Sequence, residues 1–149
     1  MSIDKSLIDS QHLIISSEGY YPEKIKLNNS DSYIIDMTKL DQKYILEDLL
    51  FDYDSYKLTE SVKNFLFLYA QWLKQNDEIN IRIEGHTDSV GSDNYNMTLS
   101  ENRANEVLNF FVSEGILKNR MKAIGFGDKI PVAEGYDGPK NRRIEITVF

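Results

Sequence analysis

Three side chains able to bind ions or exchange protons follow one another in the stretch GHTDSVGSDNYNMTLSENRANEV. His86, Thr87 and Asp88 come directly after a short alternating segment, and Arg103 follows on residues with helical spacing. A catalytic nucleophile needs an adjacent base that a third group orients. His86 and Asp88 leave opposite faces if the strand continues, and the other histidine, His12, lies far away in the sequence. The pattern therefore argues against a hydrolase, and we predict no catalytic residues.

A metal site is no better supported by this stretch. His86 and Asp88 supply two ligands, whereas zinc usually takes three or four from N, S or O donors. A calcium loop needs carboxylates at alternating positions and a terminal glutamate, which GHTDSVGSDNYN does not provide. We predict neither a metal ion nor another cofactor.

A socket for a ligand with both charges explains more of the residues. Asp88 lies just beyond a predicted strand, and Arg103 lies near the first turn of the predicted next helix, one position before the apolar Ala104. A carboxylate can bind an ammonium while a guanidinium grips a carboxylate in a bidentate manner, and N–H groups at the helix start would assist. The alternative is a turn-forming aspartate and a solvated arginine.

Composition excludes several classes of protein. The 149 residues carry 17 basic and 24 acidic side chains, a net charge of −7, which argues against a nucleic-acid binder and weakly against adsorption on an anionic membrane. The chain has no cysteine, so it can form no disulfide or thiolate site. No signal peptide is visible, and the longest apolar run is far below the ~20 residues of a spanning helix. We expect a soluble chain whose targeting or anchoring segment has been removed or lies on a longer parent.

Two regions differ in their pattern. Residues 1–42 are rich in short β-type runs, at His12–Ser16, Lys24–Leu27 and Tyr33–Met37, separated by turn residues. Three such strands cannot easily bury a core alone. We interpret them as an edge sheet or, with slight preference, as the end of a preceding β-domain. Residues 43–149 form the main domain.

Strands and helices alternate in the main domain, which predicts an α/β (α+β sandwich) fold with helices packed on a mixed sheet. The predicted strands are Tyr44–Phe51, the alternating run ending at Gly85, Met121–Gly125 and Arg143–Phe149. One amphipathic helix covers residues 58–73, with Thr59 as its N-cap and Asn76 ending it. A second begins after Ser100 as N-cap and closes at Gly115.

The blocks LLFDYDSYKL, EGHTDSVGSDNYNMTLSENRANEVLNFFVSEGI and AIGFGDKIPVAEG…NRRIEI together resemble the OmpA-like peptidoglycan-binding domain, in its order and spacing. The resemblance covers about Tyr44 to Phe149 and implies a βαβαβ-type fold. It also implies that Asp88 and Arg103 bind the ammonium and carboxylate of diaminopimelate in the stem peptide. Further implied contacts are Asp52, Tyr53, Asp54, His86, Thr87, Asn96, Leu99, and Arg142 or Arg143 at the rim.

Structural roles remain open for several of these residues. Leu99 fits a core position better than a ligand contact, His86 suits a hydrogen-bonding role equally well, and Asp52 and Asp54 suit a turn. Of Arg142 and Arg143, the residue on the outer face of the last strand is expected to be solvated.

The resemblance implies a non-enzymatic tether that binds peptidoglycan in the periplasm and belongs to an outer-membrane or envelope protein, or to a secretion apparatus. Other envelope proteins are further candidate partners, and we expect no insertion of this chain into a membrane. The N-terminal anchor cysteine of lipoprotein members and the strands of barrel members are missing. The first 42 residues look like the end of an Ig-like or carboxypeptidase-regulatory-like domain, as in long Bacteroidetes envelope proteins. The alternative functions are a protein-docking module and a motor-stator domain.

Overall fold

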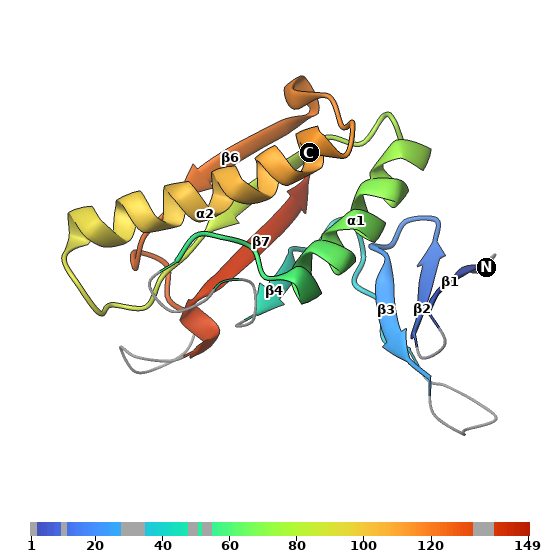
Figure 1. Cartoon of the computed structure of the whole chain (residues 1–149), viewed down its shortest axis with the longest axis horizontal. Helices are drawn as coiled ribbons and strands as arrows, with labels where there is room; N and C mark the ends of the chain where they lie inside the picture. Colours follow the sequence, from blue (N-terminus) through green and yellow to red (C-terminus); the bar gives the residue numbers. More distant parts are fainter. Residues whose placement is uncertain (1–2, 10–11, 28–34, 48–50, 52–54, 133–138) are drawn as a thin grey trace.

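The computed structural model describes residues 3–9, 12–27, 35–47, 51, 55–132 and 139–149 (Figure 1). In chain order the elements are β1 (Ile3–Asp9), β2 (His12–Ser17), β3 (Glu23–Lys26), β4 (Tyr44–Glu47), α1 (Glu60–Gln75), β5 (Ile81–Gly85), α2 (Asp93–Ser113), β6 (Met121–Gly125) and β7 (Arg143–Val148), with 3-10 turns at Lys118–Arg120 and Pro139–Asn141. No helix in this described part is long and apolar enough to cross a membrane.

A four-stranded mixed sheet with the order β4-β7-β5-β6 forms the centre of the main domain. β7 runs antiparallel to both β4 and β5, whereas β5 and β6 are parallel. Parallel neighbours need a long crossover, and α2 provides it between β5 and β6. α1 and α2 pack on the sheet (Figure 1). The predicted α/β class, with helices on a mixed sheet, is confirmed.

Alternation along the two central strands creates the core. The isoleucines of β5 and β7 are at most 1% exposed and point toward the helices. Their partners are the apolar stripes of α1 and α2, and this burial is the main stabilising term of the fold. The largest fully buried members of the set are Leu66, Tyr69, Leu73, Ile81, Ile83, Val107, Phe111, Ile144 and Ile146.

The predicted start of α1 is confirmed, and the predicted start of α2 is wrong. α1 starts after Thr59 and ends at Asn76, as predicted. α2 starts after Ser92, whose Oγ accepts a hydrogen bond from the Tyr95 N–H, so the prediction of Ser100 as N-cap is wrong. Ser100 instead lies inside the helix, where its Oγ donates to the Met97 carbonyl and accepts from the Gly127 N–H. A serine that binds locally inside a helix resembles a cap in sequence.

The N-terminal strands form a separate three-stranded antiparallel sheet, β1-β2-β3. β2 and β3 match the first two predicted runs, and β1 was not predicted. The described part of the third run, residues 35–37, is not a strand, and residues 33–34 lie outside the described residues. β4 spans Tyr44–Glu47, the described part of the strand predicted to Phe51, and residues 48–50 lie outside the described residues.

One residue of the N-terminal region enters the main core. The Tyr21 ring is fully buried, 5.2 Å from the ring of Tyr44 and 6.1 Å from that of Trp72. Its hydroxyl lies 3.1 Å from the Gln42 carbonyl oxygen and accepts a hydrogen bond from the Val148 N–H. The segment before β3 is therefore attached to α1 and to the end of β7.

Candidate functional site

The candidate site lies where β5 ends and β7 begins. The sheet register places Gly85 opposite Ile144, and beyond it the His86 N–H donates to the Arg143 carbonyl. The Thr87 N–H donates to the carbonyl of Gly127 in the loop after β6. Backbone hydrogen bonds thus fix the start of the HTD sequence against two neighbouring segments.

Asp88 has two partners, one in the backbone and one in a side chain. Its Oδ1 accepts a hydrogen bond from the Val90 N–H at 3.2 Å, the pattern of an Asx turn. Its Oδ2 lies 2.9 Å from Nη1 of Arg142 in an ion pair. Asp88 therefore shapes its own turn and also presents a carboxylate that is paired with a rim arginine.

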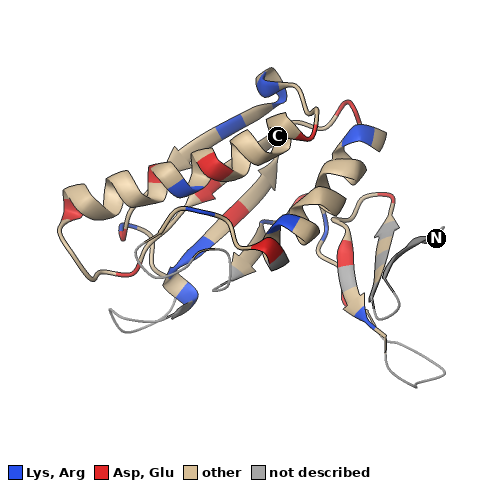
Figure 2. Cartoon of the chain, in the orientation of Figure 1, with Lys and Arg blue, Asp and Glu red and all other residues tan. Residues whose placement is uncertain are grey.

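Arg103 is the only basic residue of α2, whose other charged side chains are acidic (Figure 2). It is 5% exposed, its Nε donates to the Ser55 carbonyl at 3.0 Å, and its guanidinium carbon lies 5.0 Å from the centre of the Phe51 ring. Because α2 begins after Ser92, Arg103 lies deep in the helix, so the predicted position in the first turn is wrong. The helix N–H groups expected to assist it lie about 15 Å away along the axis.

The strand that precedes Asp88 packs closely against α2, the helix that carries Arg103. Gly85 packs so closely against α2 that an added Cβ would overlap the Ser100 carbonyl oxygen. Arg103 is held from the other side by the segment at Ser55. Asp52, Tyr53 and Asp54, predicted on that segment, lie outside the described residues.

Three predicted residues carry buried polar atoms without hydrogen-bond partners in the described structure. They are Oγ1 of Thr87, Nδ2 of Asn96 and both ring nitrogens of His86, whose residues are 4%, 1% and 1% exposed. An unsatisfied buried polar atom costs about 1–3 kcal/mol, so native structures rarely keep one without a reason. Leu99, on the same helix as Asn96, is half-buried.

The remaining predicted residues divide between the rim and the interior. The Arg142 side chain is 38% exposed and belongs to the rim. Arg143 is buried, with its guanidinium bonded to Glu145 and to the Ile130 carbonyl, so the rim position in the structure belongs to Arg142. The His86 ring is also buried and stacks on Phe126 with 5.5 Å between ring centres.

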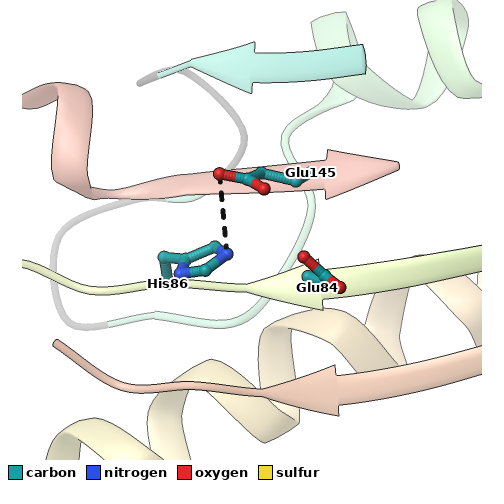
Figure 3. A group of neighbouring side chains, drawn as sticks. All are labelled: Glu84, His86 and Glu145. Carbon is teal, nitrogen blue, oxygen red and sulfur yellow. Dashed lines mark ion pairs between the residues drawn. The ribbon is translucent and has the colours of Figure 1, made fainter. Parts of the chain in front are cut away.

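His86 forms a buried group with two glutamates, Glu84 and Glu145 (Figure 3). Nε2 of His86 lies 3.8 Å from Oε1 of Glu145. Burial and the nearby Arg143 charge lower the pKa of His86 to about 4, so the ring is neutral at pH 7. Burial alone would raise the pKa of Glu145, but hydrogen bonds from Lys43 and Arg143 bring it below its usual value.

Glutamate and histidine are metal ligands, yet in this group the carboxylates already bind cations. Nζ of Lys43 lies 3.1 Å from Glu84 and 2.6 Å from Glu145. Arg82 pairs with Glu84 and Arg143 with Glu145. A divalent ion would have to displace the lysine and would meet two arginines, a poor electrostatic fit.

Sequence reasoning missed this buried ionic group. Polar residues that alternate with isoleucines along a strand usually face solvent, whereas Glu84 is 3% and Glu145 2% exposed. A signal was present, because RIE occurs in both strands and predicts acidic residues on one face of adjacent strands. The compensating lysine, Lys43, lies far from both glutamates in the sequence, and only the fold brings it close to them.

The chain is similar to several envelope proteins. Residues 50–145 match the OmpA family. The outer membrane porin F of Pseudomonas aeruginosa is 40% identical over 105 residues, which cover 68% of this chain but 30% of the porin. The crystal structure of the peptidoglycan-associated lipoprotein from Burkholderia pseudomallei has 32% identity and a TM-score of 0.64, over 70% of this chain and 91% of that one. A MotB-like protein from Desulfovibrio vulgaris has 27% identity and a TM-score of 0.65, over 71% of each chain. With nearly two-thirds of its residues matched and the fold in agreement, this chain belongs to the OmpA family.

Proposed function

We propose that the chain binds peptidoglycan through the diaminopimelate of the stem peptide and has no enzymatic activity. The observation that carries the proposal is the similarity to the Burkholderia lipoprotein, named for its association with peptidoglycan, over 91% of that structure. The chain spans only 30% of the Pseudomonas porin, so the proposal concerns the domain and not a whole porin.

The chemistry of the site supports a ligand with both charges. Diaminopimelate carries an ammonium and a carboxylate on one side-chain carbon. The Asp88 carboxylate suits the ammonium, and the Arg103 guanidinium suits the carboxylate. The unsatisfied polar atoms of Thr87 and Asn96 supply further hydrogen-bonding capacity. Few ligand atoms are buried in such a site, so affinity per site is modest, and repeated sites along the wall provide avidity.

In this role the domain tethers a larger envelope protein to the wall. It works in the periplasm and is associated with the outer membrane through a longer parent chain or a partner, such as a secretion apparatus. The porin and lipoprotein similarities support an envelope location. Within this proposal residues 1–42 are the end of a preceding β-domain and residues 43–149 the binding domain. The similarities give no support to a Bacteroidetes origin.

A calorimetric titration with a diaminopimelate stem peptide and its lysine counterpart tests the proposal. The lysine peptide keeps the ammonium and lacks the side-chain carboxylate. We expect the wild type to prefer the diaminopimelate peptide, and Asp88→Ala and Arg103→Ala to weaken its binding at least about tenfold. Arg103→Lys complements the alanine variant, because it keeps the charge of a buried side chain and loses the bidentate geometry.

Asp77→Ala is the matched control, since it removes an exposed carboxylate next to the end of α1. Its affinity should equal that of the wild type. Absence of binding to both peptides would contradict the proposal, and release of labelled muropeptides by the purified protein would reveal an enzyme instead.

The second candidate is a stator or protein-docking domain, and the similarity to the MotB-like protein favours it. Such a domain uses the same fold to bind a protein partner. The wild-type titration separates a docking domain from a tether, because a docking domain without a ligand site responds to neither peptide. A stator domain is itself a tether to the wall, and a membrane-spanning helix upstream in the parent gene would identify it.

A further inference from the structure

The Asp88 carboxylate is already covered by a cation of the chain itself. Its Oδ2 lies 2.9 Å from Nη1 of Arg142, and its Oδ1 accepts a bond from the Val90 N–H. The Asp88 side chain is 12% exposed and that of Arg142 is 38% exposed. A ligand that approaches Asp88 therefore meets the guanidinium as well as the carboxylate.

The backbone holds this pair in place. Arg142 precedes β7, and the next residue, Arg143, is buried and bonded to Glu145 and to the Ile130 carbonyl. The Arg143 carbonyl in turn accepts the N–H of His86, which lies two residues before Asp88. Asp88 follows His86 and Arg142 precedes Arg143, and hydrogen bonds hold both His86 and Arg143 in place. The pair is therefore preorganised before a ligand arrives.

A paired carboxylate and guanidinium attract a bare cation weakly. The ammonium of a ligand at Asp88 gains attraction from the carboxylate and loses most of it to repulsion by the neighbouring guanidinium. A ligand with an ammonium and a carboxylate on one carbon avoids this loss, because its carboxylate, which Arg103 binds in the proposed function, can also contact the more exposed Arg142. The pair therefore favours a zwitterion over a simple amine.

We propose that Arg142 determines the specificity of the site by neutralising Asp88 toward ligands that carry only an ammonium. The inference rests on the proposed function and adds a residue-level basis for rejecting lysine-type peptides. Arg142 differs in this from Arg103, which is buried and bonded to the Ser55 carbonyl. Arg142 selects against the wrong ligand in addition to binding the right one, a common source of specificity.

The test is a titration of Arg142→Gln with the diaminopimelate and lysine stem peptides at one ionic strength. We expect the lysine peptide to bind about tenfold tighter than it binds the wild type, and the diaminopimelate peptide to bind several-fold weaker. Arg142→Lys keeps the charge and should keep the preference of the wild type. Lys140→Gln removes an exposed cation two residues away and should change neither affinity.

The outcomes separate the inference from the proposed function. A wild type that prefers the diaminopimelate peptide, with Arg142→Gln keeping the same ratio of affinities within about twofold, overturns the inference and leaves the proposed function standing. An Arg142→Lys variant that loses the preference also overturns it, because charge would then not be the cause. A wild type that binds neither peptide overturns both.

Discussion

At the scale of single residues, Lys43 resolves a conflict that the sheet creates. The register of β5 and β7 places Glu84 directly opposite Glu145, and like charges in that position destabilise a sheet. The Lys43 ammonium bonds to both carboxylates, and Arg82 and Arg143 each pair with one of them. The neighbouring His86 stays neutral chiefly because it is buried, and the charges of Arg143 and Lys43 lower its pKa further.

The low pKa of His86 makes stability depend on pH. Its folded-state pKa is about 4, below the usual 6.5, so the unfolded chain binds a proton first as the pH falls. The free energy of unfolding should therefore decrease below about pH 6.5, by about 1–2 kcal/mol at pH 5, and by no further amount from this residue below its folded pKa. Urea unfolding at pH 7, 6 and 5 measures this loss.

His86→Gln should remove that part of the pH dependence of the free energy of unfolding, whatever the substitution does to the stability at pH 7. The matched control is His12→Gln, which removes the other histidine of the chain and should keep the slope of the His86 titration. Equal pH slopes for the wild type and His86→Gln would show that the histidine ionises in the folded state as readily as in the unfolded state.

The sequence pointed to the types of residue at the site but not to their pairings. Charge complementarity and spacing indicated Asp88 and Arg103, and the family resemblance indicated the others. The partner of Asp88 in the structure, Arg142, lies 54 positions away, and its contact depends on the β5–β7 register. Arg142 and Arg143 are adjacent in sequence yet have opposite environments, which only the fold decides.

At the scale of elements, the close contact between α2 and the sheet depends on glycine. Gly85, the last residue of β5, leaves no room for a Cβ because of the Ser100 carbonyl oxygen, with the Ala104 Cβ also 3.4 Å away. The Gly125 position in β6 is similarly close, with an added Cβ 2.5 Å from the Glu101 nitrogen. Two strands thus meet the middle of α2 backbone to backbone.

Gly85→Ala should destabilise the domain by about 2–4 kcal/mol, because the methyl group forces the helix away from the sheet. Alanine is otherwise better than glycine in a strand, so a gain in stability would contradict the close contact. Chemical denaturation followed by circular dichroism measures the change. Gly19→Ala is the control: it has a positive φ of 82° but open space around it, and should cost about 1–2 kcal/mol.

Element prediction succeeded where the hydrophobic period was clear. α1, β5, β6 and β7 agree with their predicted positions because isoleucine alternation and the three- and four-residue spacing are strong local signals. The start of α2 was placed eight residues late, because the first two turns of the helix, Asp93–Ser100, are largely polar. These turns are stabilised by the Ser92 cap and by their position at the site, neither of which produces an apolar stripe.

At the scale of the whole molecule, Tyr21 joins the N-terminal sheet to the main core. Its hydroxyl accepts the Val148 N–H and lies near the Gln42 and Ile146 carbonyl oxygens, and burial raises the pKa of the phenol. Its ring lies among three aromatic residues of the core. The division at residue 42, expected from composition, is thus crossed by one fully buried side chain.

Tyr21→Phe should lower the free energy of unfolding by about 1–2 kcal/mol, since it leaves the partly buried Val148 N–H without its partner. Trp72 is the only tryptophan, and its fluorescence during urea unfolding reports on the main core. We expect its midpoint to move together with that of the circular dichroism signal. Tyr20→Phe, the same change one residue earlier at a half-buried position, should have an effect within about 0.5 kcal/mol. An unchanged tryptophan midpoint in Tyr21→Phe would indicate that the N-terminal region unfolds on its own.

The placement of Tyr21 also has a mechanical consequence. Tyr21 contacts the end of β7, at Ile146 and Val148, whereas the candidate site lies at its start, beside Arg143. A pulling force between the N-terminal region and a ligand held at the site would therefore run along β7 (Figure 1). The ladder bonds from β7 to its antiparallel neighbours β4 and β5 are perpendicular to the strand, so this force loads them in shear, many at once. A strand loaded in shear resists extension better than one peeled away bond by bond.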